Sequence, residues 1–448
     1  QDVVANDGGH TSGTNQYTWA SIPNNIKTEA AQIRITDVNF ATETTFTMPS
    51  TFRIRPKLQV DQPISSSSWT VDSNQLIKWT QIQGNQVSFV KLYYDTNGAG
   101  TYAGIINDSG TVTVALGSTG YTWTIPDIIG TQVKVKVMDA QAGYTNVFSV
   151  SPNFKVKGGL TLTAPTSSTR WTVHTTQTGA VPNNVSWTFN GSMANVDVFY
   201  DLNDLNGDQW TSIGTKAQSG NGGSSTFLWN MITGDITTVT NNVRIRIEDK
   251  ADPTNVYLIS QLFKLGAKFD VTAPENGAPV YSENTATTIT WTTQEGTAIG
   301  ELKVYYSNNS EDATPTWILI GTALGSATSI PWNPIPRALA DLSSTDHRVK
   351  VTQSNPSNED YAFNIGGGTK FPILGTLTVT QPSGGESWDA NSTVTIQWTK
   401  KGNLQSVDVY YSKEGAPANY VKITPSPIDI SDATGGASPY SFAWYLNP

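Results

Sequence analysis

The sequence predicts an all-β protein made of tandem β-sandwiches in an extended array. Three observations predict this class: an internal repeat of just over one hundred residues, short runs in which apolar and polar residues alternate, and turn-forming residues between the runs. Alternation with a period of two is typical of half-buried strands, because successive side chains point to opposite faces of a sheet. No stretch keeps the 3.6-residue spacing of an amphipathic helix, so we expect strands throughout.

The first strand of every repeat ends in proline. The four prolines stand 102, 109 and 108 residues apart, and apolar residues lie five and three positions before each. Self-similarity at a fixed period indicates a chain of equivalent modules. The prolines are Pro63, Pro165, Pro274 and Pro382, and the aromatic residues that follow them by six or seven positions are Trp69, Trp171, Tyr281 and Trp388.

Tryptophan marks two further strands of the repeat. We call a set of equivalent positions in successive repeats a column. One tryptophan column precedes threonine: Trp79, Trp187, Trp291 and Trp398. The other column appears five times: Trp19, Trp123, Trp229, Trp332 and Trp444. Exposed rings could instead form platforms that stack on sugars, but a residue that returns in every repeat is more simply a core residue, where an aromatic ring buries about 150–250 Å². We therefore predict that these nine rings form the structural core.

A later strand of the repeat alternates strictly between valine or isoleucine and polar residues. Its apolar members are Ile33 and Ile35; Val133, Val135 and Val137; Val243, Ile245 and Ile247; and Val349 and Val351. About seven strands in about 105 residues fits an immunoglobulin-like sandwich. The chain has no cysteine, so packed aromatic residues must replace the disulfide of antibody domains.

The phase of the repeat divides the chain into five units joined by linkers of two or three residues. Short linkers give little reach, so we expect a rod with limited bending. The partial units at both ends predict that identical or same-chain neighbours pack against them, end to end or laterally. The units are 1–56, the C-terminal half of a repeat; the complete repeats 57–157, 158–265 and 266–374; and 375–448, the N-terminal part of a repeat.

The composition argues against several classes of function. Charged residues make up only 14% of the chain and the formal net charge is −9, which disfavours nucleic acid as a partner, because its phosphates require lysine and arginine. No apolar run reaches the roughly 20 residues of a membrane helix, so we expect no direct membrane insertion. A surface rich in serine, threonine and asparagine favours an extracellular location, and glycan attachment at its Asn-x-Ser/Thr sites is plausible chemistry.

The loop after the third strand of the second complete repeat offers the best candidate metal ligands. Asp201, Asn203, Asp204 and Asp208 place oxygen atoms at intervals typical of calcium loops. Their register is poor, since Leu202 falls where the first ligand should stand and no glutamate follows at the twelfth position. A solvated hairpin explains the loop more simply. We expect no cofactor, with calcium as the weaker alternative.

No group of residues predicts catalysis. The three histidines fall at different positions of the repeat, and no pair of carboxylates stands out as an acid–base couple. One strand carries a basic stripe that includes Lys136, Arg246 and Lys350. Such a stripe could bind an acidic glycan or a neighbouring acidic chain, but the solvated face of an alternating strand explains it more simply. We therefore expect a protein that is not an enzyme.

Residues 376–399 read TLTVTQPSGGESWDANSTVTIQWT. This segment resembles a bacterial cell-surface immunoglobulin-like repeat of the Pro-x-Gly-Gly-Glu-x-Trp type, which is related to a Ser/Thr-rich domain of fungal cell-wall proteins. The matching residues are Pro382, Gly384, Gly385, Glu386, Trp388, Ile396, Trp398 and Thr399. The resemblance is weak in the other repeats. It implies a secreted scaffold or surface role and no catalytic residue, because the motif is a folding motif.

These observations predict a non-catalytic structural segment of a large extracellular protein at the cell surface, as in a surface layer or a filament. Two alternatives stay open. One is the stalk of a bacterial adhesin, and the other is a carbohydrate-binding appendage of a secreted hydrolase. An appendage more often has one or two copies of a module than an unbroken array.

Overall fold

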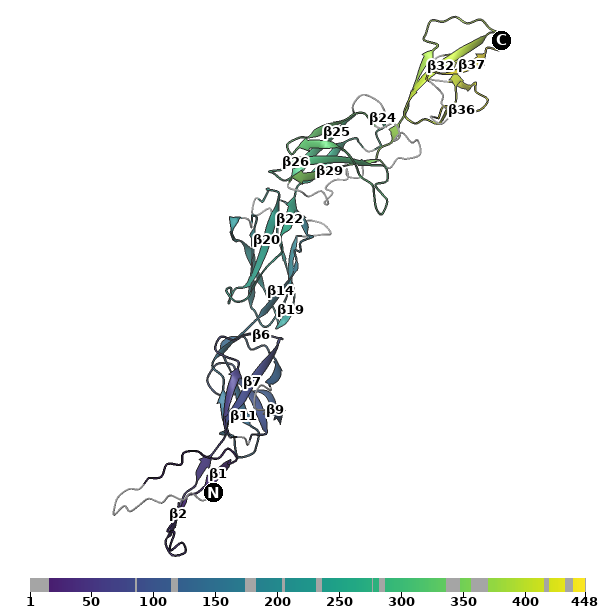
Figure 1. The fold of residues 1–448 in the computed structure, drawn as a ribbon. Helices are drawn as coiled ribbons and strands as arrows, with labels where there is room; N and C mark the ends of the chain where they lie inside the picture. The colour runs from purple at the N-terminus through teal and green to yellow at the C-terminus, as the bar shows by residue number, and fades with distance from the viewer. Residues whose placement is uncertain are drawn as a thin grey trace.

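The computed structural model describes residues 16–84, 87–113, 120–173, 183–203, 206–230, 236–275, 277–281, 287–335, 347–355, 370–414, 419–431 and 438–447. These residues form strands and no α-helix, so the all-β prediction is confirmed. Nothing in these ranges is a helix of the length and apolarity that a membrane span requires. The sandwiches follow one another end to end in a long, gently bent rod, and residues 16–56 and 375–447 lie at its opposite ends (Figure 1).

Residues 57–157 form a complete sandwich of two sheets. The smaller sheet has the order β10-β7-β5, and the larger has the order β6-β13-β11-β8-β9, with β12 beside β11. The chain leaves the first sheet after β5 so that β6 pairs in parallel with β13 on the opposite sheet, as in immunoglobulin-like domains. The strands are β5 (Lys57–Gln62), β6 (Ser68–Thr70), β7 (Asn74–Gln83), β8 (Phe89–Asp95), β9 (Gly104–Thr113), β10 (Gly120–Thr124), β11 (Gly130–Asp139), β12 (Phe148–Val150) and β13 (Phe154–Lys157).

Residues 158–265 repeat this topology strand for strand. One sheet has the order β14-β16-β19, and the other has the order β15-β22-β20-β17-β18, with β21 beside β20. The strands are β14 (Gly159–Ala164), β15 (Arg170–Thr172), β16 (Asn184–Asn190), β17 (Asn195–Asp201), β18 (Thr211–Ala217), β19 (Gly222–Leu228), β20 (Thr240–Asp249), β21 (Tyr257–Ile259) and β22 (Phe263–Gly266).

Residues 266–374 form the third sandwich, with strand orders β23-β25-β28 and β27-β26-β29 and a parallel β24-β30 pair. Its strands are β23 (Lys268–Ala273), β24 (Val280–Tyr281), β25 (Thr287–Glu295), β26 (Glu301–Ser307), β27 (Ile318–Leu324), β28 (Ser329–Trp332), β29 (Arg348–Asn355) and β30 (Ile373–Leu374).

The last unit contains the sheet β31-β32-β37 and two short pairs, β33-β36 and β34-β35. The sheet corresponds to β5-β7-β10 of the first complete repeat. The strands are β31 (Thr376–Gln381), β32 (Thr393–Lys401), β33 (Ser406–Val407), β34 (Tyr410–Tyr411), β35 (Val421–Lys422), β36 (Ile428–Asp429) and β37 (Tyr440–Tyr445).

The first unit consists of two strand pairs, β1-β4 and β2-β3. Thr28 pairs with Ile54 and Ala31 pairs with Phe52. The same pairing recurs 102 residues later between β11 and β13, where Gly130 pairs with Val156 and Val133 pairs with Phe154. The unit therefore carries the last strands of a repeat. The strands are β1 (Thr28–Ala31), β2 (Arg34–Thr36), β3 (Thr45–Thr47) and β4 (Phe52–Ile54).

The tryptophan columns occupy the sandwich cores in the three complete repeats. Seven of the nine rings are buried to at least 93%: Trp79, Trp123, Trp187, Trp229, Trp291, Trp332 and Trp398. Within a repeat the rings contact one another, as in the edge-to-face contact of Trp171 and Trp229, whose centroids lie 5.9 Å apart. The core therefore rests on aromatic packing in place of a disulfide.

The prediction that all nine tryptophan rings lie in a core is wrong for Trp19 and holds only in part for Trp444. Trp19 lies in no strand and is half-buried, because its unit holds no described counterpart of β7, the strand with which the Trp123 strand pairs. Trp444 lies in β37 but is also only half-buried. It packs beside Tyr411, at 4.8 Å between centroids, on a face that lacks a counterpart of β11 among the described residues.

Candidate functional site: the joints between repeats

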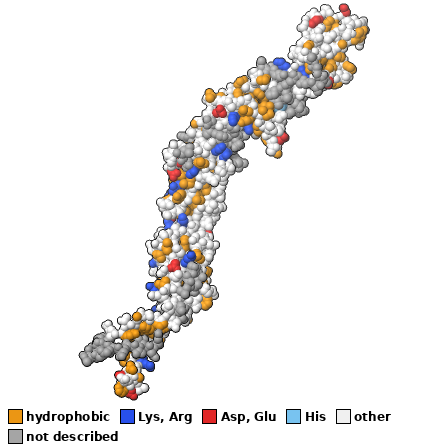
Figure 2. Space-filling model, viewed as in Figure 1, with side chains coloured by type: hydrophobic (Ala, Val, Ile, Leu, Met, Phe, Trp, Pro, Cys, Tyr) orange, Lys and Arg blue, Asp and Glu red, His pale blue; other side chains and the backbone are white. Residues whose placement is uncertain are grey.

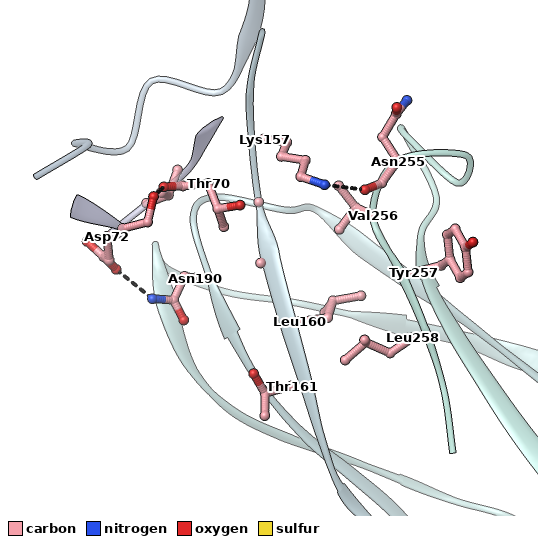
Figure 3. A pocket seen from close by; sticks show the side chains of 14 residues that line it. Thr70, Asp72, Lys157, Leu160, Thr161, Asn190, Asn255, Val256, Tyr257 and Leu258 are labelled. Carbon is pink, nitrogen blue, oxygen red and sulfur yellow. Dashed lines mark hydrogen bonds between the residues drawn. The ribbon is translucent and has the colours of Figure 1, made fainter. Parts of the chain in front are cut away.

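The joint between 57–157 and 158–265 is polar. The Nζ atom of Lys155 lies 2.5 Å from Oδ2 of Asp252. The Nζ atom of Lys157 donates a hydrogen bond of 2.7 Å to the carbonyl oxygen of Asn255. Across the same joint Asn190 donates from Nδ2 to Oδ2 of Asp72, at 3.0 Å (Figure 3). Bonds from both sheets therefore restrain the angle between the two sandwiches.

Asp127 and Gly191 add contacts to this joint beside the Asp72–Asn190 bond. The backbone N–H of Ser192 donates to Oδ1 of Asp127 at 3.0 Å, and the Ser192 hydroxyl pairs with its second oxygen. Gly191 has a φ of +89°, and a Cβ there would lie 2.9 Å from Cδ1 of Ile129. Only glycine allows this approach at this backbone angle, so the sequence brings the two repeats into direct contact.

An open groove of about 410 Å³ lies in the same joint. Its walls include Asp72, Lys157, Asn190 and Tyr257, and two of its polar side chains, Lys157 and Asn190, reach across to partners of the adjoining repeat (Figure 3). Nowhere in the described ranges do three histidine or acidic residues gather as a metal site would require. The arrangement in this groove serves to hold two repeats together.

The joint between 158–265 and 266–374 is mainly apolar. One continuous cluster of buried side chains runs through both repeats and includes Leu265, Ala267 and Phe269 around the linker. The backbone N–H of Thr297 donates to the carbonyl of Thr237 at 2.7 Å, and Ala267 donates to Oε1 of Gln353 at 3.1 Å. The two repeats therefore share one hydrophobic core across the joint.

The first unit is fixed to 57–157 by a buried ion pair. Lys27 contacts the carboxylate of Asp139, and both side chains are at least 95% buried. The Lys27 ammonium also lies 4.1 Å from the ring centroid of Tyr144. Nearby, Arg55 donates two hydrogen bonds of 2.8 Å to Glu29, and these bonds are the main reason that the pKa of Glu29 is lowered.

The structure gives the candidate calcium loop a different role. Asp201 is buried, and its two carboxylate oxygens accept backbone hydrogen bonds from Asn203 at 2.9 Å and Gln209 at 3.1 Å. Asn203 and Asp208 are exposed, and Asp204 lies outside the described residues. The carboxylate of Asp201 thus closes the hairpin after β17.

Sequence reasoning missed this role, although a signal for it was present. Asp95 stands at the same position of the preceding repeat, and its carboxylate accepts from Asn97 at 3.2 Å and Gly100 at 2.5 Å. Ser307 takes the place in the third repeat and accepts from Asn309 at 3.1 Å. A polar residue at this strand end in successive repeats indicates a hairpin cap.

The glycine-rich motif of the last unit is a turn organised by Glu386. Its carboxylate accepts from the backbone N–H of Ser383 at 2.5 Å, from the Ser383 hydroxyl at 2.8 Å and from the N–H of Gly384 at 2.7 Å. The hydrogen bonds from Ser383 are the leading cause that lowers the pKa of Glu386 to about 2. Gly384 and Gly385 have φ values of +108° and +86°, which favour glycine.

The basic stripe contacts aromatic rings of the same chain. The Nζ of Lys136 lies 4.8 Å from the ring centroid of Phe148, and the guanidinium of Arg246 lies 4.5 Å from that of Tyr257. Lys350 lies 4.6 Å from the Trp317 centroid in the third repeat. These cations therefore stabilise the sandwich surface through cation–π contacts. Basic and acidic side chains are scattered over the visible face and form no large patch of one sign (Figure 2).

Comparisons with known proteins identify no family. No family model matches the chain, and no curated protein matches it. Among solved structures it is similar to fibronectin(III)-like modules of Clostridium thermocellum CbhA, at 12% identity and a TM-score of 0.15, over 43% of this chain and 83% of the other.

Two further structures are similar to larger parts of the chain. A tetra-tandem repeat from the extending region of a large adhesion protein matches at 14% identity with a TM-score of 0.23, over 88% of this chain and 90% of the other. Domains A168–A170 of titin match at 13% identity with a TM-score of 0.26, over 67% of this chain and 94% of the other. The chain is a tandem array of immunoglobulin-like β-sandwiches, as its own sheet topology shows.

Proposed function

We propose that this chain is a stiff, non-catalytic structural segment of an extracellular surface protein, a building block of a surface layer or filament. The observation that carries the proposal is the construction of the joints. Lys155 and Asp252 pair across one joint, and Leu265, Ala267 and Phe269 extend one core through the next. Independent modules on flexible tethers need no such contacts, because their linkers allow free reorientation.

The surface also supports an inert role. Several of its cations are engaged in ring contacts, and others in ion pairs such as Lys91 with Asp108, at 2.7 Å. The aromatic columns that could have offered sugar platforms lie in the cores of the complete repeats. An extracellular setting fits a chain with few charged residues and many hydroxyl and amide side chains.

Distances between spin labels test the stiffness of the joint. Because the chain has no cysteine, labels can be attached at engineered Thr113→Cys and Ser212→Cys, which are exposed positions on strands of successive repeats. Double electron–electron resonance should give one narrow distribution of distances between the two labels. Insertion of Gly-Ser-Gly-Ser after Gly158 should broaden it, whereas the same insertion after Gly98, inside a hairpin of one repeat, should leave it narrow. A broad distribution in the unmodified joint would contradict the proposal.

A further inference from the structure

Asn190 and Gly191 form an asparagine–glycine dipeptide at the joint between 57–157 and 158–265. The asparagine is needed there as a donor, since its Nδ2 bonds Oδ2 of Asp72 at 3.0 Å (Figure 3). The glycine is needed because its φ is +89° and a Cβ would lie 2.9 Å from Cδ1 of Ile129. Both residue types therefore follow from contacts with the preceding repeat.

An asparagine followed by glycine is the dipeptide that cyclises most readily, because glycine has no side chain to obstruct the approach of its own nitrogen. The nitrogen of Gly191 would lose its proton and attack Cγ of Asn190. The new C–N bond closes a succinimide ring, and the Cγ–Nδ2 bond breaks with release of ammonia. Water then opens the ring and leaves aspartate or isoaspartate at position 190. The net change is gain of a water and loss of an ammonia, with no other reactant.

The backbone around Asn190 is held in a geometry that blocks this attack. Asn190 ends β16 and pairs on one side with Gly159 of β14 and on the other with Gly222 of β19. Gly191 is buried, and its N–H, which carries the attacking nitrogen, donates to the carbonyl of Asn221 at 2.7 Å. Conversion therefore requires local opening of this strand end.

The preceding repeat keeps the strand end closed. Val71 and Ile129 pack against Gly191, where their side-chain carbons lie 3.1 and 2.9 Å from the position of a Cβ. Oδ1 of Asp127 accepts the backbone N–H of Ser192 at 3.0 Å. Separation of the two repeats removes these contacts, so conversion of Asn190 is coupled to opening of the joint.

Conversion would also prevent the joint from closing again. It removes the Nδ2 donor and places a carboxylate where the amide now bonds Asp72. Carboxylates at such a separation repel each other. Oδ1 of Asp127 lies 3.4 Å from the Cβ position of Gly191, so a further negative charge is close. Lys157 lines the same groove, but its ammonium already donates to the carbonyl of Asn255 at 2.7 Å.

We infer that Asn190–Gly191 is a self-modification site that turns an opening of this joint into a permanent release. A closed joint keeps Asn190 intact. An opened joint frees it to cyclise, and the carboxylate that results holds the repeats apart. The inference rests on the proposed stiff joint and deepens it, because the stiffness of the joint then has a chemically limited lifetime.

Peptide mass spectrometry of the full chain, incubated at mildly alkaline pH, measures conversion from the mass gained when the amide NH₂ is replaced by OH. Asn206–Gly207 is the internal control, since both residues are exposed after β17. Asn190 should convert at least about tenfold more slowly than Asn206, because it reacts only from an opened state. In the urea-unfolded chain the two rates should be similar. Equal rates in the folded wild type would overturn the inference.

Lys155→Ala removes an ion pair across the joint without touching the dipeptide. This variant should speed conversion at Asn190 and leave the rate at Asn206 unchanged. Absence of any acceleration at Asn190 would also overturn the inference, because opening of the joint would then not control the reaction.

Asn190→Asp places the aspartate product in the chain directly. With spin labels at positions 113 and 212 it should broaden the distance distribution, whereas Asn206→Asp should leave it narrow. Adding Asp72→Asn to Asn190→Asp exchanges donor and acceptor and should restore the narrow distribution. Asparagine is suited to position 72, where φ is +63°. Circular dichroism checks that each variant keeps its fold.

A narrow distribution in Asn190→Asp, or a broad one in the double variant, would contradict the release mechanism. A broad distribution in the wild type would instead contradict the proposed stiff joint. The two failures are therefore distinguishable.

Discussion

The ammonium of Lys155 and the carboxylate of Asp252 lie 2.5 Å apart and join two successive sandwiches through side chains that are each about three-quarters buried. Burial opposes ionisation of Asp252, but hydrogen bonds from Lys155 and Asn255 outweigh it and lower the pKa of Asp252. The pair therefore restrains the joint at neutral pH. A lowered pKa means that its contribution is present above the unfolded pKa and is lost as the pH falls.

Loss of this ion pair should loosen the joint more than it destabilises either repeat. Lys155→Ala should broaden the distance distribution between labels at positions 113 and 212, and should lower the free energy of unfolding by only about 1 kcal/mol, because the pair is partly open to solvent. Lys91→Ala removes an ion pair within one repeat and should leave the distribution unchanged. An unbroadened distribution in Lys155→Ala would show that the pair does not set the joint angle.

Replacement of Trp187, one of the tryptophans that precede threonine, should destabilise the fold less with phenylalanine than with alanine. Trp187 is almost fully buried, and its indole Nε1 has no hydrogen-bond partner among the described residues, as is also true of Trp79, Trp291 and Trp398. Trp187→Ala should cost about 3–5 kcal/mol, because a large buried ring leaves a cavity. Trp187→Phe should cost clearly less, because it also removes an unsatisfied buried donor. Urea unfolding followed by far-ultraviolet circular dichroism measures both; equal losses would contradict the packing argument.

The turn around Glu386 should respond to acid. Its carboxyl has a pKa of about 2, below the ordinary value of 4.5, so the stabilisation is complete above about pH 4.5 and is lost as the pH falls through about 2. Glu386→Gln should therefore lower the thermal stability of the last unit at pH 7, and the difference from wild type should shrink towards zero near pH 2. Glu414→Gln changes an exposed glutamate of the same unit and should show no such difference. A gap that persists at pH 2 would contradict this assignment.

Removal of divalent ions should leave the repeat 158–265 unaffected. Both oxygens of Asp201 already accept backbone hydrogen bonds, and the loop gathers no described cluster of acidic ligands. The melting temperature of the full chain should be the same with chelator and with added calcium. A fall of several degrees with chelator, reversed by calcium, would show that the loop binds the ion, because binding to the native state alone stabilises it.

The repeat pattern predicted the fold well because equivalent positions occupy the same strand and the same side of the sheet in each complete repeat. The strand with Val133, Val135 and Val137 alternates because one of its faces is always buried in the core. The Pro382 motif likewise reports a local turn, whose hydrogen bonds join residues two and three positions apart. Signals of this kind lie within a few residues of one another and are legible without the structure.

The joints could not be predicted in the same way. Lys155 and Asp252 are 97 residues apart in sequence, and nothing in the basic strand shows which acid will face it. The prediction failed at Trp19 for a related reason. A tryptophan of this column is buried only where the strand that corresponds to β7 lies beside it, and the sequence around Trp19 does not show whether that strand is there. The capping role of Asp201 was legible from Asp95, but the sequence predicted only a solvated hairpin, with calcium as the weaker alternative.

Small-angle X-ray scattering of the full chain, extrapolated to low concentration, tests the central claim, a stiff rod of end-to-end sandwiches, most directly. The longest strands have ten residues, as in β7 and β11, so each repeat should be about 35 Å long and the rod should have a radius of gyration of about 45 Å. A compact protein of this length would give about 22 Å. We predict the larger value together with a distance distribution that has the long tail of a rod. A value close to that of a compact particle would contradict the account.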